Sequence, residues 1–122
     1  TWIVNVKDLM QSCADLPVEL GPANKITRGA LSWQMAVRDD GSMPFDGAFP
    51  MLMQWPDGPH PAARMTDLGC RLEQMTVVHP KAAEIQQMLQ GQLDMANIHF
   101  EIGDAMSMRA EIKTPNGIKL LK

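Results

Sequence analysis

Four polar side chains on two predicted strands could together bind a small molecule. Ser32, Gln34 and Arg38 belong to the first of these strands, where they alternate with apolar residues. Gln54 has the same alternating environment in the second strand. Hydroxyl and amide groups orient a ligand by hydrogen bonds, and a guanidinium group binds a carboxylate through two parallel hydrogen bonds. We therefore expect these four residues to bind a small organic acid.

A proline-rich loop after the second strand adds two candidate ligand-binding residues. His60 lies between Pro59 and Pro61, and Arg64 follows four residues later. Binding residues often lie on loops that a rigid scaffold positions, so His60 and Arg64 are candidates for the same site. Two structural alternatives remain open, because these residues could instead tie the loop to the sheet and the arginines could pair with neighbouring aspartates.

No arrangement of residues specifies a reaction. The three histidines lack the spacing of metal ligands, and the glycines form no phosphate-binding loop. Cys13 lies on the apolar side of a predicted helix and Cys70 follows a turn glycine, so we expect both to be reduced core residues. The catalytic residues are therefore unknown, and the sequence does not decide whether the chain is an enzyme.

Length and composition indicate one globular domain. The chain has 122 residues, of which 45% are hydrophobic, and 11 basic against 14 acidic residues give a net charge of -3. An acidic chain without a basic cluster argues against nucleic acid as a partner. No apolar run reaches the roughly 20 residues that span a bilayer, and no signal peptide is evident, so we expect a cytoplasmic protein without a membrane partner.

The hydrophobic pattern predicts the same order of elements twice. Each half begins with a strand and a helix and continues with three strands. The expected elements are a strand at 2–6, a helix from Asp8, strands at 25–28, 31–38 and 49–55, a strand at 74–78, a helix from Pro80, and strands at 98–102, 108–113 and 118–121. This order predicts an α+β fold in which two βαβββ modules form one curved mixed sheet with helices on its outer face. Residues 1–58 and 70–122 are the modules, 59–69 is the linker, and residues 1–122 form a single domain.

The alternation also predicts which sheet face the helices cover. We expect the apolar residues to pack beneath the helices and the polar residues to face the ligand cleft. The apolar set is Trp33, Met35, Met51 and Met53. The opposite assignment stays open, because Trp33 and Trp55 could themselves form the walls of a ligand site.

The doubled βαβββ order resembles the vicinal oxygen chelate superfamily, which includes glyoxalase I, extradiol dioxygenases and several antibiotic-resistance proteins. Residues 31–41, 49–55 and 59–69 resemble the C-terminal half of bacterial glyoxalase-like domain proteins, and the similarity extends to the closing 114–118. The resemblance implies a bacterial origin. Such relatives usually carry another such module upstream.

The resemblance also implies where a metal ion would bind. Metal-dependent members take ligands from the first and last strands of each module, which here correspond to Thr1, Gln54, Glu73 and one of Ile118, Lys119 or Leu120. This set holds one carboxylate, one amide and no imidazole, whereas zinc, nickel and iron sites favour imidazole with carboxylate. We therefore expect no metal and no cofactor, so the resemblance is one of fold and not of activity.

Three functions remain in competition. The first is a glyoxalase-like domain that binds a small organic molecule in a concave cleft. The second is a structural module whose sheet pairs with a second copy to form a homodimer. The third is a metal-dependent lyase or dioxygenase. An open cleft with polar walls favours the first, and a filled cleft favours the second.

Overall fold

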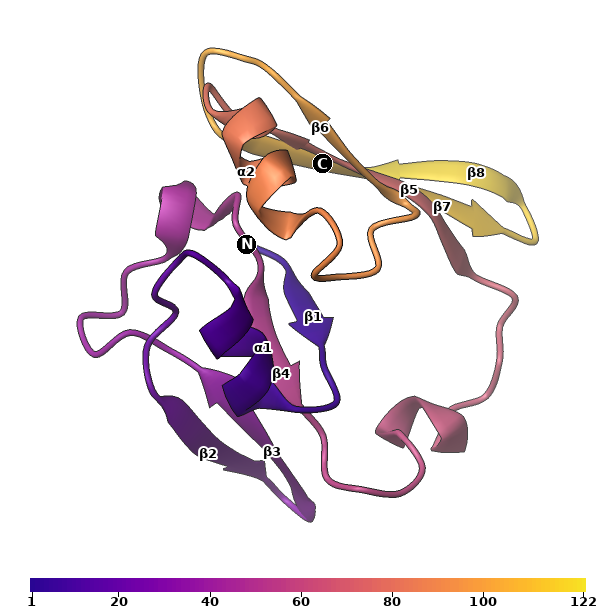
Figure 1. Ribbon diagram of the computed structural model, residues 1–122. Helices are drawn as coiled ribbons and strands as arrows, with labels where there is room; N and C mark the ends of the chain where they lie inside the picture. Colours follow the sequence, from indigo (N-terminus) through magenta and orange to yellow (C-terminus); the bar gives the residue numbers. More distant parts are fainter. The chain divides into compact units, whose positions relative to one another are not determined.

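The computed structural model describes residues 1–122, which divide into two compact units, Thr1–His60 and Pro61–Lys122. The first unit contains β1 (Ile3–Asn5), α1 (Leu9–Asp15), β2 (Ala23–Arg28), β3 (Leu31–Ala36), the 3₁₀ helix η1 (Pro44–Gly47) and β4 (Met51–Gln54) (Figure 1). The second contains the 3₁₀ helix η2 (Pro61–Arg64), β5 (Arg71–Val78), α2 (Ala82–Leu89), β6 (Ile98–Glu101), β7 (Ser107–Thr114) and β8 (Gly117–Leu121). The predicted α+β class and the repeated βαβββ order are confirmed.

Each unit forms a four-stranded mixed sheet of its own. In the first sheet the strand order is β1-β4-β3-β2, with β1 parallel to β4 and the other pairs antiparallel. The joining of the two sheets into one curved sheet stays a prediction, as does the single domain.

Helix α1 begins where the sequence predicts. The Asp8 backbone is extended, and its carboxylate accepts a hydrogen bond of 3.0 Å from the Gln11 amide, which satisfies one of the free N–H groups at the helix start. The helix ends at Asp15, two residues before Pro17, because proline disfavours helical backbone in the residue that precedes it. The short helix therefore has well-defined ends and lies across β3 and β4.

The face of the sheet that α1 covers is opposite to the predicted one. The core beneath the helix contains Leu9, Ala36 and Leu52, each at most 1% exposed. The β3–β4 register places Leu52 and Gln54 on the same face as Ala36. The side chain of Gln54 contacts the start of α1, and Trp33 and Met53 are only half-buried on the other face. The predicted burial of the tryptophan and methionine face beneath the helices is therefore wrong, since alternation separates two faces without saying which one a helix covers.

The second sheet has a different strand order from the first. It runs β6-β5-β7-β8, with β5 parallel to β6 and the other pairs antiparallel. The last strand, β8, is therefore an edge strand paired with β7, whereas the last strand of the first unit, β4, lies beside β1. The two halves repeat the order of elements along the chain but not the order of strands in the sheet.

The core of the second unit lies between α2 and its sheet. Val77, Ile85 and Leu89 are completely buried, as the predicted apolar stripe of α2 requires. The turn at Pro115, Asn116 and Gly117 joins β7 to β8, and Gly117 has a φ of 92°, which glycine adopts readily. No helix of the structure has the length and hydrophobicity that a membrane crossing requires.

Candidate functional site

A cavity of about 290 Å³ lies in the first unit, where β3 and β4 run side by side. Its position follows from the end of β4, since Pro56 cannot donate to the sheet and the chain leaves the ladder there. The residues that line the cavity are Lys25, Ser32, Trp33, Gln34, Gln54, Trp55 and Pro56. The volume suits a small organic molecule.

Two tryptophans among these lining residues lie together on the sheet face opposite to Gln34 and Gln54. The Trp33 and Trp55 ring centroids are 5.1 Å apart, and the ring planes are inclined by 45°. The pairing of Gln34 with Gln54 makes the next residues along, Trp33 and Trp55, cross-strand neighbours. Both indoles are half-buried, so part of each remains accessible to a ligand. Such a pair offers a large apolar surface to a flat group.

Three polar side chains form a row across the neighbouring strands. Lys25 of β2 lies opposite Gln34 of β3, and Gln34 lies opposite Gln54 of β4. Residues directly opposite each other point to the same face of the sheet, about 5 Å apart. Lys25 and Gln34 are exposed, and neither side chain makes a hydrogen bond or an ion pair with another residue. These two groups are therefore available to a ligand.

Gln54 also has a structural role in this row. Its Oε1 accepts a hydrogen bond of 2.9 Å from the backbone amide of Leu9, the first residue of α1. The carbonyl end of the amide is thus committed to the helix, and the Nε2 group keeps its hydrogen atoms for other partners. Towards the cavity, Gln54 can therefore only donate hydrogen bonds.

The structure brings three of the six predicted binding residues to one cavity, namely Ser32, Gln34 and Gln54. It also adds Lys25, which the sequence reasoning missed. The signal was present, because Lys25 lies in the predicted strand at 25–28 and a hairpin with the next strand places it beside Gln34. No pairing partner was predicted for the strand at 25–28, so Lys25 was not placed beside Gln34.

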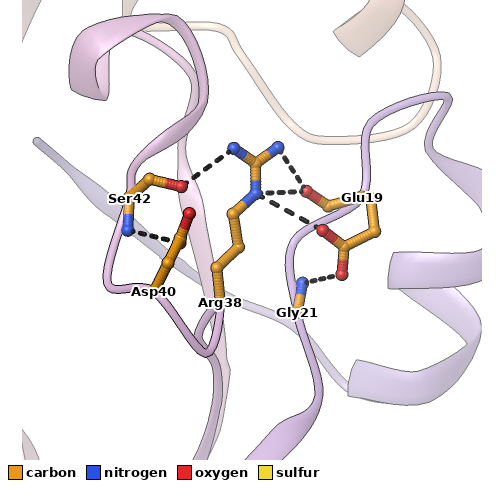
Figure 2. Close-up of polar contacts among 5 residues, drawn as sticks. All are labelled: Glu19, Gly21, Arg38, Asp40 and Ser42. Carbon is orange, nitrogen blue, oxygen red and sulfur yellow. Dashed lines mark hydrogen bonds and ion pairs between the residues drawn. The ribbon is translucent and has the colours of Figure 1, made fainter.

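Arg38 makes contacts within the first unit instead of lining this cavity (Figure 2). Its Nε and Nη2 donate to the backbone carbonyl of Glu19 at 2.9 and 2.7 Å, and Nη1 donates to Ser42 Oγ at 3.3 Å. Its Nε also lies 3.4 Å from the Glu19 carboxylate, whose other oxygen accepts from the Gly21 amide. The guanidinium group thus holds the segment before β2 against the turn after β3. Ligand binding by Arg38 stays a prediction.

The surface around Arg38 is rich in carboxylates. A shallow depression of about 360 Å³ is lined by Glu19, Asp39 and Asp40 together with Arg38, Pro22 and Ser42. A hydrogen bond from the Ser42 backbone amide lowers the pKa of Asp40, so this carboxylate stays charged at neutral pH. Three carboxylates beside one guanidinium group disfavour an anionic ligand in this depression.

The two loop candidates lie in different units. His60 contacts Trp55 edge-on with ring centroids 5.5 Å apart, which confirms its predicted position at the end of the Trp55 strand. Arg64 belongs to the second unit, where it is the last residue of η2 and is exposed. Ligand binding by either residue stays a prediction.

The residues at the family's metal positions do not fit a transition metal. No three histidine, cysteine, aspartate or glutamate side chains gather at one place in residues 1–122. The carbonyl oxygen of Gln54, its only metal-binding atom, is already bonded to Leu9. In the second sheet β7 separates Lys119 on β8 from Glu73 on β5, so first and last strands do not meet. The residues at these positions therefore have neither the ligand types nor the arrangement that such an ion needs.

The two cysteines are free thiols in different surroundings. Cys13 is half-buried on α1, and burial raises the pKa of its thiol because the thiolate is poorly solvated there. Cys70 is exposed in the segment before β5, so its predicted place in the core is wrong. The chain turns at Gly69 in this exposed segment, and the Asp67 carboxylate accepts a hydrogen bond from the Gly69 amide.

The fold is an α+β arrangement of two four-stranded mixed sheets, with a cavity beside the first. Residues 1–93 match the family model described as glyoxalase-like domain, and the chain belongs to this family. The match covers the first unit and continues through β5 and α2. It ends before β6, β7 and β8, and these strands give the second sheet its different order. No curated protein matches the chain, and no solved structure does.

Proposed function

We propose that this glyoxalase-like domain binds a small organic molecule with a flat apolar part in the Trp33–Trp55 cavity, and that it does so without a transition metal. The observation that carries the proposal is the pair of accessible indoles, with ring centroids 5.1 Å apart, among the residues that line an open cavity. Apolar walls with a few oriented polar groups are the usual composition of a ligand site.

The main alternative is an assembly module whose cleft is filled by a second copy of the chain. The open cavity and the free ends of Lys25 and Gln34 support ligand binding over this alternative. A metal-dependent lyase or dioxygenase has less support, because the donor set at the family's metal positions holds one carboxylate, one amide and no imidazole.

A ligand screen tests the proposal. We expect aromatic probes to raise the melting temperature of the protein, and Trp33→Leu to weaken binding of the best probe about tenfold by removing stacking surface. Met53→Leu is the matched control, because Met53 lies on the same strand as Gln54 but does not line the cavity. Its volume is nearly unchanged, so binding should persist.

Two results would contradict the proposal. One is that no aromatic probe of any charge stabilises the protein. The other is that Met53→Leu and Trp33→Leu weaken binding equally while both variants keep the wild-type circular dichroism spectrum, which would place the ligand elsewhere.

A further inference from the structure

We infer that the second unit has a ligand site of its own, a cavity between α2 and β6 that binds a short aliphatic amine through its alkyl chain and its ammonium group. This α2–β6 cavity has a volume of about 250 Å³. It is independent of the Trp33–Trp55 cavity, since all the residues that line it belong to the second unit.

The strand side of the α2–β6 cavity lies on the sheet face that α2 covers (Figure 1). Ile98 and Phe100 alternate on β6 and line the cavity, and the register places Phe100 opposite Val77 of β5. Val77 is completely buried in the core beneath α2, as is Ile85 of the helix. Residues directly opposite each other point to the same face of a sheet, and so do residues two apart on one strand. Ile98 and Phe100 therefore both point toward the helix, so one ligand can contact strand and helix together.

The loop between α2 and β6 completes an apolar wall. Gly91 follows the helix with a φ of 77°, which glycine adopts readily, and the chain turns back there toward β6. Leu93 and Met95 of this loop line the cavity and are half-buried. Such flexible side chains adapt to an alkyl chain. The volume of about 250 Å³ lies just below the range of about 300–1,000 Å³ for drug-sized ligands, so the chain must be short.

Two glutamine side chains form the polar end of the cavity. Gln86 and Gln90 line it one turn apart at the end of α2, where the Gln90 amide donates to the Gln86 carbonyl at 3.0 Å. Both residues are exposed, and neither side chain makes a hydrogen bond with another residue. A primary ammonium group has three donors, and the two side-chain carbonyl oxygens can accept two of them. Two such acceptors at one end of an apolar cavity suit an amphipathic amine.

The charge around the cavity favours a cation over an anion. No lysine or arginine lies between residues 82 and 108. The basic residues that flank this stretch, Lys81 and Arg109, are already paired with glutamates. Asp94 lies in the cavity loop between two lining residues, and no basic side chain pairs with it. The last turn of α2 adds the negative end of the helix dipole, so an ammonium group is attracted and a carboxylate is repelled.

NMR titrations of the intact chain with three probes test this inference. The probes are hexylammonium, hexanamide and hexanoate, which share a short alkyl chain and have no ring to stack on the tryptophans. Labelling the methionine methyl groups with ¹³C gives a signal for Met95, which Met95→Leu assigns. We expect hexylammonium to shift this signal in a saturable way and to bind about tenfold more tightly than hexanamide, with hexanoate the weakest.

Substitutions of Gln86 test the polar end of the cavity. Gln86→Leu should weaken hexylammonium binding about fivefold by removing an acceptor, and Gln86→Glu should strengthen it by adding a negative charge. Gln87→Leu is the matched control, because it makes the same change at the next exposed residue of α2, which does not line the cavity. It should leave binding unchanged. Leucine is a good helix former, and the circular dichroism spectrum of each variant checks that it is folded.

Each contrary outcome refutes a defined part of the inference. If hexanamide or hexanoate binds as tightly as hexylammonium, the assignment of an amine is refuted. Equal losses in Gln86→Leu and Gln87→Leu refute the contact with Gln86. A Met95 signal that stays unchanged at high hexylammonium concentration refutes the site itself. None of these results bears on the proposed function, which is tested with aromatic probes and Trp33→Leu.

Discussion

Replacing Gln54 separates its structural role from its role in the cavity. The Gln54 carbonyl is the acceptor for the Leu9 amide at the start of α1, and this contact is partly buried. Gln54→Met keeps the length of the side chain and removes the acceptor. A partly buried amide without a partner costs about 1–2 kcal/mol, so the first unit should be destabilised by this amount.

Gln54→Glu is the matched variant. A carboxylate keeps an acceptor for Leu9, and the bond is charge-assisted, so stability should stay within about 0.5 kcal/mol of the wild type. The same carboxylate adds a negative charge beside Lys25 and Gln34. It should therefore weaken the binding of any anionic ligand at this part of the cavity without unfolding the protein.

Thermal melts followed by tryptophan fluorescence measure both effects. All three tryptophans lie in the first unit, so the signal reports that unit. A loss of 1–2 kcal/mol corresponds to a decrease in melting temperature of about 4–16 °C for a unit of this size. A Gln54→Met variant that melts like the wild type would refute the reasoning, because Leu9 would then have another acceptor and Gln54 would be free at both ends.

Three further predictions follow from the surroundings of single groups. The purified protein should contain no stoichiometric zinc, nickel, iron or manganese by elemental analysis. One equivalent of any of them would refute the conclusion that the residues at the family's metal positions do not fit a transition metal. Cys70 should react with a thiol reagent before Cys13, because Cys70 is exposed whereas Cys13 is half-buried with a raised pKa; mass spectrometry of partly labelled protein would show the order, and the reverse order would contradict it. Gly21→Ala should destabilise the protein by more than about 1 kcal/mol in urea melts, since Gly21 has a φ of 88° and an added Cβ would collide with the Val37 carbonyl; Gly29→Ala, also at positive φ but in open space, is the control and should lose less.

Much of the fold could be predicted from local pattern. The Asp8 cap, the proline after α1 and the hairpin before Gly117 each act over a few residues, so their signals are complete within the sequence. The order of strands in the second sheet could not be predicted in this way. It depends on whether β6 or β8 pairs with β5, and the hydrophobic pattern of a strand does not specify its pairing partner.

The candidate site was predicted in part for a similar reason. Alternation grouped Ser32, Gln34 and Gln54 correctly, because strand periodicity determines which residues share a face. It could not show that Gln54 bonds to Leu9 or that Arg38 bonds to Glu19, since both contacts join elements that are distant in sequence. Lys25 was overlooked because only the pairing of β2 with β3 places it beside Gln34.

The central claim is that a ligand occupies the cavity at Trp33 and Trp55. Heteronuclear NMR of the indole N–H groups tests it most directly, because the chain has three tryptophans and therefore three such signals. Trp2 is an internal control, since its indole N–H donates to the Ala48 carbonyl at 2.9 Å and Trp2 does not line the cavity.

On titration with the aromatic probe that stabilises the protein most, the indole signals of Trp33 and Trp55 should shift in a saturable way, while the Trp2 signal stays in place. The assignments come from single Trp→Phe variants. Shifts confined to Trp2, or three signals that stay unchanged at saturating probe, would contradict the account.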